Sequence, residues 1–215
     1  MKGILFNGEM VRAILEGRKT QTRRVVKPQP QRFFEVNDEP FYLYDVEWGL
    51  GRIYPRYQPG DILWVKETWR IGAWCEEGLI AVDYKADNFA RKEWIEVPDP
   101  ERFERYWIQS TDEAEAAGLK TDKEGEYHWK PGEAPTRWRP SIFMPREAAR
   151  IFLKVTGVRV ERVWEMTGED AIKEGVNWFN DACGFAKLWD SINGKKYPWA
   201  SNPWVWVYEF ERVEK

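Results

Sequence analysis

The amino-acid sequence predicts a mixed α+β protein, mainly β, in which a small barrel carries added helices. Three observations support this class: many segments alternate like strands, few segments have helical periodicity, and strands and helices do not alternate along the chain. Such alternation is typical of parallel α/β sheets, so that class is not expected. The length of 215 residues fits one domain with insertions.

The first elements are a short strand, a helix and a second strand. Residues 4–6 are apolar and predict the first strand. Asn7 is a suitable N-cap for a helix whose apolar residues share one face before Gly17 ends it. The β-branched residues of segment 18–26 indicate a strand, which Pro28 ends.

The next segments are an irregular excursion and a strong strand. Residues 31–57 contain prolines and scattered aromatic residues, and we expect them to be a long irregular excursion with aromatic anchors. Residues 62–69 are the strongest strand up to this point. Period-two alternation places Glu67 on the same face as Leu63 and Val65, so this carboxylate ends an apolar face.

Residues 70–137 are expected to be an insertion on the core. They contain a candidate strand at 79–84, an acidic stretch and an alanine-rich helical candidate at 111–117. Together with the irregular excursion, this interpretation predicts a large insertion.

The C-terminal part returns to regular elements. Residues 149–163 alternate like a pair of strands or one bent strand, and a change of phase predicts a bulge at Gly157. Thr167 and Asp170 have the spacing of a capping box and open a short helix, and a second helix follows. Residues 204–213 alternate as the closing strand.

Composition excludes several classes of protein. The chain is 43% hydrophobic and 32% charged, as is typical of globular proteins, and no apolar run approaches the roughly 18 residues of a membrane helix. The N-terminus does not resemble a signal peptide. Two cysteines are too few and too far apart for a disulfide scaffold or a zinc cluster. We therefore expect a cytoplasmic protein without membrane partners.

The aromatic content and the charge distribution favour a nucleoside or nucleic-acid ligand. The chain has 14 tryptophans, whose indoles can fill a core or stack on bases. Residues 1–36 carry eight Lys or Arg against three Glu, whereas residues 76–126 carry seven basic against fifteen acidic residues. The basic end is suited to phosphates, and the alternative is an ordinary solvated surface.

Missing residue types exclude other chemistry. His128 is the single histidine and lies in a polar segment, so Ser-His-Asp, Cys-His and multi-histidine metal sites are excluded, and we expect it at the surface. The sequence contains no phosphate-binding P-loop and no glycine-rich dinucleotide motif. We therefore expect neither a metal nor a cofactor.

Two motifs carry a resemblance to a known family. Residues 17–24 read Gly-Arg-Lys-Thr-Gln-Thr-Arg-Arg, and residues 60–67 read Gly-Asp-Ile-Leu-Trp-Val-Lys-Glu. This pair resembles the activating-signal-cointegrator homology (ASCH) superfamily, whose members have a PUA-like β-barrel. The chain is similar to longer ASCH proteins of phages and prophages in four further segments, which are 143–146, 158–161, 174–176 and 202–207. The resemblance implies one PUA-like domain over 1–215, with insertions at about 31–55 and 75–135.

The resemblance also implies an activity. Small bacterial ASCH proteins include amidohydrolases that deacetylate N4-acetylcytidine with a lysine, a threonine and a glutamate. Matching by motif places these roles on Lys19, Thr22 and Glu67. Two arginines follow Thr22, where those enzymes have an aliphatic residue and one arginine, which leaves the substrate open.

Elementary chemistry gives this trio a physical rationale. A threonine hydroxyl becomes nucleophilic when a base takes its proton, and a desolvated Lys19 has the lowered pKa that this role needs. Glu67 on an apolar face would have a raised pKa and could donate a proton to the leaving amine. A regular strand separates residues 19 and 22 onto opposite faces, so Lys19 must lie in the turn before the strand.

The neighbouring residues suggest how a substrate binds. Arg18, Arg23 and Arg24 are candidate phosphate contacts, and Trp69 is a candidate for stacking on a base. The alternatives are a solvated cationic edge for the arginines and a buried structural ion pair between Lys19 and Glu67.

Two functions of different class follow. The first is a metal-free amidohydrolase that acts on an acylated modified pyrimidine nucleoside or nucleotide. The second is a non-catalytic binder of single-stranded RNA or modified nucleic acid, and a metal-independent ribonuclease is a more remote third.

Overall fold

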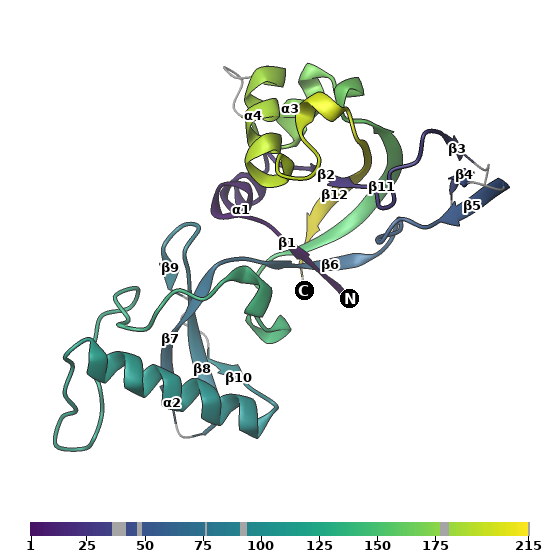
Figure 1. The fold of residues 1–215 in the computed structure, drawn as a ribbon. Helices are drawn as coiled ribbons and strands as arrows, with labels where there is room; N and C mark the ends of the chain where they lie inside the picture. Colours follow the sequence, from purple (N-terminus) through teal and green to yellow (C-terminus); the bar gives the residue numbers. More distant parts are fainter. Residues whose placement is uncertain (36–41, 47–48, 76, 91–93, 177–180, 215) are drawn as a thin grey trace. The chain divides into compact units, whose positions relative to one another are not determined.

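The computed structural model shows a mixed α+β protein that is mainly β, with several sheets and few helices, which confirms this level of the predicted fold class (Figure 1). It describes residues 1–35, 42–46, 49–75, 77–90, 94–176 and 181–214. Among these residues, no helix combines the length and the apolar content that crossing a membrane requires.

The chain divides into two compact units. Unit 1 comprises Met1–Lys2, Ala13–Leu63 and Phe152–Lys215, and unit 2 comprises Gly3–Arg12 and Trp64–Ile151. The expected organisation as one domain with insertions stays a prediction.

Unit 1 is built on three antiparallel strands, of which two are long. They are β2 (Gln21–Val25), β11 (Phe152–Arg162) and β12 (Trp204–Val213). β12 lies between the other two, and its pairing with β11 shifts register between Val155 and Gly157. The bulge predicted at Gly157 is therefore confirmed.

Helices cover one face of these strands. Val205 and Val207 of β12 pack with residues of α3 (Gly168–Lys173) and α4 (Asp181–Asn193) in a buried core (Figure 1). α3 begins with the predicted capping box, because the hydroxyl of Thr167 accepts a hydrogen bond from the Asp170 backbone N–H.

Residues 31–57 contain a regular sheet, so the expected irregular excursion is wrong there. The strands β3 (Phe33–Glu35), β4 (Tyr42–Val46) and β5 (Gly49–Ile53) pair antiparallel. Phe33 and Tyr42 pack edge to face on Trp206, with ring centroids 6.1 and 5.1 Å away. These aromatic residues anchor the small sheet, as the sequence predicts, but pairing between strands is what orders the backbone.

Unit 2 contains another sheet and the longest of the described helices. Its elements are β7 (Trp69–Cys75), β8 (Leu79–Tyr84), β9 (Phe89–Ala90), β10 (Ile95–Glu96) and α2 (Pro100–Ala116). β8 pairs with β7 and β10, and Phe103 of α2 belongs to the core on this sheet. The strand predicted at 79–84 is confirmed, whereas the helix predicted at 111–117 begins earlier, at an N-cap formed by Asp99.

The chain passes between the units within three elements, which are β1 (Lys2–Leu5), α1 (Gly8–Leu15) and β6 (Ile62–Lys66). Asn7 Oδ1 accepts a hydrogen bond from the Met10 N–H at 2.8 Å, which confirms the predicted cap of α1. The remaining elements are short 3₁₀ helices at Ser141–Phe143, Arg146–Ala148, Val163–Glu165 and Trp199–Ser201.

Candidate functional site

Lys19 lies in the turn between α1 and β2, where the sequence argument requires it. The backbone N–H groups of Arg18 and Lys19 both donate to the carbonyl of Ala13, at 2.9 and 3.0 Å. These bonds keep the chain folded against the end of α1 until β2 begins at Gln21. The side chain of Lys19 is then completely buried, with 0% exposure.

The carboxylate of Glu174 holds the Lys19 amine. Nζ donates to Oε2 of Glu174 at 2.7 Å and to the Glu174 carbonyl at 2.8 Å. Burial lowers the pKa of Lys19, and the charge of Glu174 partly opposes that effect. The amine is therefore fixed in position and loses its proton more readily than an exposed lysine.

Glu174 lies at the C-terminal end of α3, where it is the C-cap residue. The following residue, Gly175, has φ of +85°, and a Cβ there would lie 2.8 Å from Cβ of Ala13 and 3.2 Å from Cβ of Lys19. Only glycine combines this backbone conformation with such close approach. Sequence reasoning did not assign Glu174, although the step from a capped helix to a glycine was a local signal for it.

Arg23 is buried beneath α3. Its guanidinium pairs with Glu161 at 2.6 Å, with Asp170 at 3.2 Å and with Glu174 at 3.2 Å, and its side chain has no exposed surface. This position differs from the exposed one that a phosphate contact requires, because period-two alternation turns Arg23 toward the acidic residues of unit 1.

Thr22 and Arg24 share the opposite face of β2. Thr22 is buried and lies opposite Tyr208 of β12 in the strand register. Tyr208 accepts a hydrogen bond from the backbone N–H of Arg56 at 3.1 Å, and burial raises its pKa to about 12. Arg24 is partly buried, and burial lowers its pKa while the charge of Glu174 raises it.

Arg18 lies at the surface of unit 1. Its guanidinium donates to the carbonyl of Gly175 at 3.0 Å and to Glu16 at 2.8 Å. With 42% of the side chain exposed, Arg18 is more accessible than Arg23 or Arg24.

Glu67 belongs to unit 2, where it pairs with Arg150. Its two oxygens accept hydrogen bonds from Arg150 at 2.9 Å each, and Arg150 also pairs with Asp87 at 2.8 Å. The Glu67 side chain is 1% exposed. Burial raises the pKa of Glu67, and the hydrogen bonds from Arg150 oppose the shift.

Trp69 is completely buried in the core of unit 2. Its ring lies 5.8 Å from that of Tyr106 and 5.6 Å from the guanidinium carbon of Arg139. Both contacts are internal, so the ring offers no exposed face to a base in this structure. Trp69 therefore has the surroundings of a core residue.

The structure thus groups the predicted site residues in two places. Lys19, Thr22 and the three arginines lie in unit 1, where Glu174 is the acidic partner of Lys19, whereas Glu67 and Trp69 lie in unit 2. Over the described ranges, His, Cys, Asp and Glu side chains form no group of three or more that could hold a metal ion. Comparisons with protein-family models, with curated proteins and with solved structures each returned no match.

Proposed function

We propose that this protein is an ASCH-type amidohydrolase with a PUA-like barrel, which removes an acyl group from the exocyclic amine of a modified cytidine-type nucleoside or nucleotide. The observation that carries the proposal is the buried amine of Lys19, whose pKa burial lowers, three residues before Thr22. The motifs at 17–24 and 60–67 suggest the substrate class.

The proposed reaction has two steps. Neutral Lys19 takes the proton of the Thr22 hydroxyl, Oγ attacks the acyl carbon, and the C–N bond breaks as Glu67 protonates the leaving amine. Water then attacks the Thr22 ester and gives one proton to Glu67. The Thr22 oxygen leaves with the proton held by Lys19, the carboxylic acid departs, and all three groups return to their starting states.

The surroundings of each group support its role. Glu174 fixes the Lys19 amine without neutralising the effect of burial, since the pKa of Lys19 stays lowered. Burial raises the pKa of Glu67, which favours the protonated form that an acid needs. Exposed Arg18 is the arginine best placed to meet a substrate phosphate.

The test is turnover of acylated cytidines. Purified protein is incubated, with and without a chelator, with N4-acetylcytidine, its 5′-monophosphate and an RNA that contains the same base, and products are followed by chromatography. We expect the deacetylated cytidine to be released. Thr22→Val should lower turnover by about a thousandfold or more, whereas Thr22→Ser should keep part of the activity.

Two other outcomes would contradict the proposal. Absence of turnover on all three substrates would remove the amidohydrolase. Binding of single-stranded RNA without turnover, with an affinity that falls as salt rises, would favour the non-catalytic nucleic-acid binder instead.

A further inference from the structure

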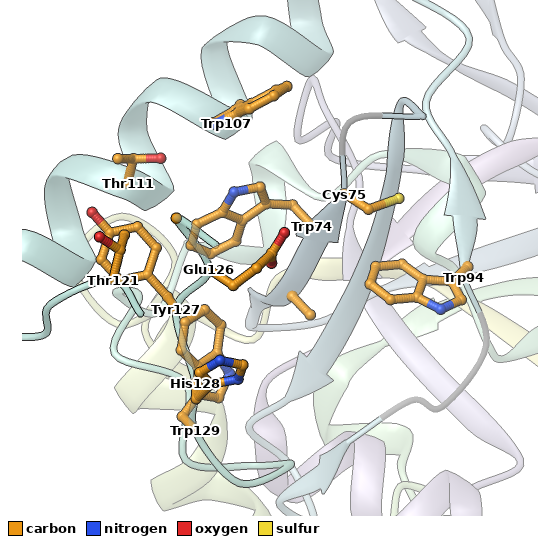
Figure 2. A pocket seen from close by; sticks show the side chains of 12 residues that line it. Trp74, Cys75, Trp94, Trp107, Thr111, Thr121, Glu126, Tyr127, His128 and Trp129 are labelled. Carbon is orange, nitrogen blue, oxygen red and sulfur yellow. The ribbon is translucent and has the colours of Figure 1, made fainter. Parts of the chain in front are cut away.

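A pocket of about 500 Å³ lies in unit 2, and none of its lining residues has been given a role above. Strand β7, helix α2 and the segment 121–129 form its walls (Figure 2). The volume is that of a typical small-molecule site. Five of the lining residues are aromatic, and they are Trp74, Trp94, Trp107, Tyr127 and Trp129.

Three of these aromatic rings pack together and form one wall of the pocket. The ring of Trp74 lies 5.4 Å from that of Trp129 at an interplanar angle of 37°, and 6.4 Å from that of Tyr127 at 49°. Both separations are those of rings in direct contact, so a flat base does not fit between either pair. Ring faces that are tilted relative to one another fit a compact, rounded group better than a flat one.

Hydrogen bonds within the protein hold this wall in place. The indole N–H of Trp129 donates to the Gly72 carbonyl at 2.7 Å, and the Tyr127 hydroxyl donates to Glu115 at 3.1 Å. Asp122 Oδ1 accepts from the backbone N–H groups of residues 124 and 126, both at 2.9 Å. A pocket that is already ordered loses little conformational entropy when a ligand enters.

The charge around the pocket favours a cation. Among the described residues, its lining includes the carboxylate of Glu126 and no Lys or Arg (Figure 2). His128, which lines the same pocket, interacts electrostatically with Glu126. His128 is bound to Asp122 at 2.6 Å, and residues 76–126 carry eight more acidic than basic side chains. A phosphate would be repelled here.

We propose that this pocket binds an organic cation with apolar substituents, namely a quaternary or methylated ammonium group. Such a cation gains cation–π attraction from the faces of several aromatic rings and ionic attraction from a carboxylate. Trp74, Trp129 and Tyr127 supply the faces, and Glu126 supplies the charge. The group could belong to a free amine or to a methylated lysine of a peptide.

The test compares two ligands of equal shape. The full-length protein is titrated with choline and with its uncharged isostere 3,3-dimethylbutan-1-ol, while the tryptophan indole N–H signals are followed by NMR. We expect saturable shifts with choline and an affinity at least about fivefold higher than for the alcohol. A trimethyl-lysine peptide that binds more tightly than choline would identify a peptide as the source of the cation.

Variants locate the site. Glu126→Gln should weaken choline about two- to fivefold and leave the alcohol unchanged, whereas the exposed Glu133→Gln should change neither. Trp74→Leu should weaken choline further, and Trp94→Leu repeats the test at a ring that is 50% exposed and therefore less needed for folding.

Three results would overturn the proposal. They are an absence of saturable shifts, equal affinity for choline and the alcohol, and tighter binding of cytidine monophosphate than of choline. The last would identify a nucleotide pocket. None of them bears on the proposed amidohydrolase, since the pocket shares no residue with it.

Discussion

Nζ of Lys19 lies 2.7 Å from Oε2 of Glu174, and both side chains are buried. Removing two charges from water is costly, and the attraction between them repays that cost only when hydrogen bonding is complete. Here the second carboxylate oxygen is also used, because it accepts a hydrogen bond from Arg23 at 3.2 Å. The pair therefore matters for stability as well as for the proposed chemistry.

Lys19→Met should destabilise the protein by about 3 to 5 kcal/mol, since it leaves Glu174 buried with only part of its compensation. The double variant Lys19→Met/Glu174→Gln should recover much of that loss, because both charges are gone. Urea unfolding measures the two values. Turnover should stay absent in both variants, so return of activity with stability would show that the amine is structural only.

The rate of the proposed reaction should depend on whether the Lys19 amine is protonated. The base is the neutral amine, so turnover rises as pH rises through the pKa of Lys19, which burial places below the ordinary 10.5. Glu174→Gln removes a charge that raises this pKa, so the rising limb of the plot of turnover against pH should move to lower pH. Glu169→Gln, on the exposed side of α3, is the control and should leave the limb in place. A limb that moves upward would contradict the assignment.

Glu67→Gln should slow hydrolysis most for substrates whose leaving group must be protonated. Hydrolysis of N4-acetylcytidine should fall by about a hundredfold, whereas an aryl acetate, whose leaving group needs no proton, should lose far less. Glu133→Gln, which changes an exposed carboxylate of unit 2, is the control and should leave the ratio of the two rates unchanged. Equal losses on both substrates in Glu67→Gln would indicate a purely structural role.

Gly175→Ala should destabilise the protein more than Gly17→Ala does. Both glycines have positive φ, +85° and +74°, but a Cβ at Gly17 meets no atom within 4 Å. We expect about 1 to 2 kcal/mol for Gly17→Ala from backbone strain alone. The close contact with Ala13 should raise the value for Gly175→Ala to about 2 to 5 kcal/mol. Equal values in urea unfolding would contradict the close packing.

The single histidine allows a direct titration. The hydrogen bond to Asp122 raises the pKa of His128 above the ordinary 6.5, and the same contact lowers the pKa of Asp122 to about 2. Asp122→Asn should bring the His128 pKa back toward 6.5, as measured by NMR of its ring protons. The charged pair favours the folded state below the His128 pKa and above that of Asp122. An unchanged His128 pKa would show that the pair does not form in solution.

Local patterns in the sequence were sufficient for several elements. The cap at Asn7, the bulge at Gly157 and the strand Trp204–Val213 each depend on a few neighbouring residues, and the structure confirms all three. The position of Lys19 in a turn also followed from a local argument, since Gly17 ends the preceding helix.

Other features depend on partners distant in the sequence. The small sheet formed by Phe33–Glu35 and the strands that follow it needs pairing between segments, which alternation in three to five residues does not reveal. Arg23 belongs to a basic run that predicts phosphate contacts, yet its side chain meets buried carboxylates. The start of α2 was missed although Asp99 and Pro100 form a standard helix start, because charged residues mask its apolar face.

The Lys19–Glu174 hydrogen bond joins residues 155 positions apart in the chain. During synthesis, the turn that holds Lys19 leaves the ribosome long before α3, whose C-cap is Glu174, so the contact between them cannot form until both have emerged. Until then the amine stays in water, protonated like any surface lysine. A nascent or truncated chain that lacks α3 would therefore carry an unreactive Lys19. Lys19 would become the base required for the proposed activity only when α3 and Glu174 have folded onto it.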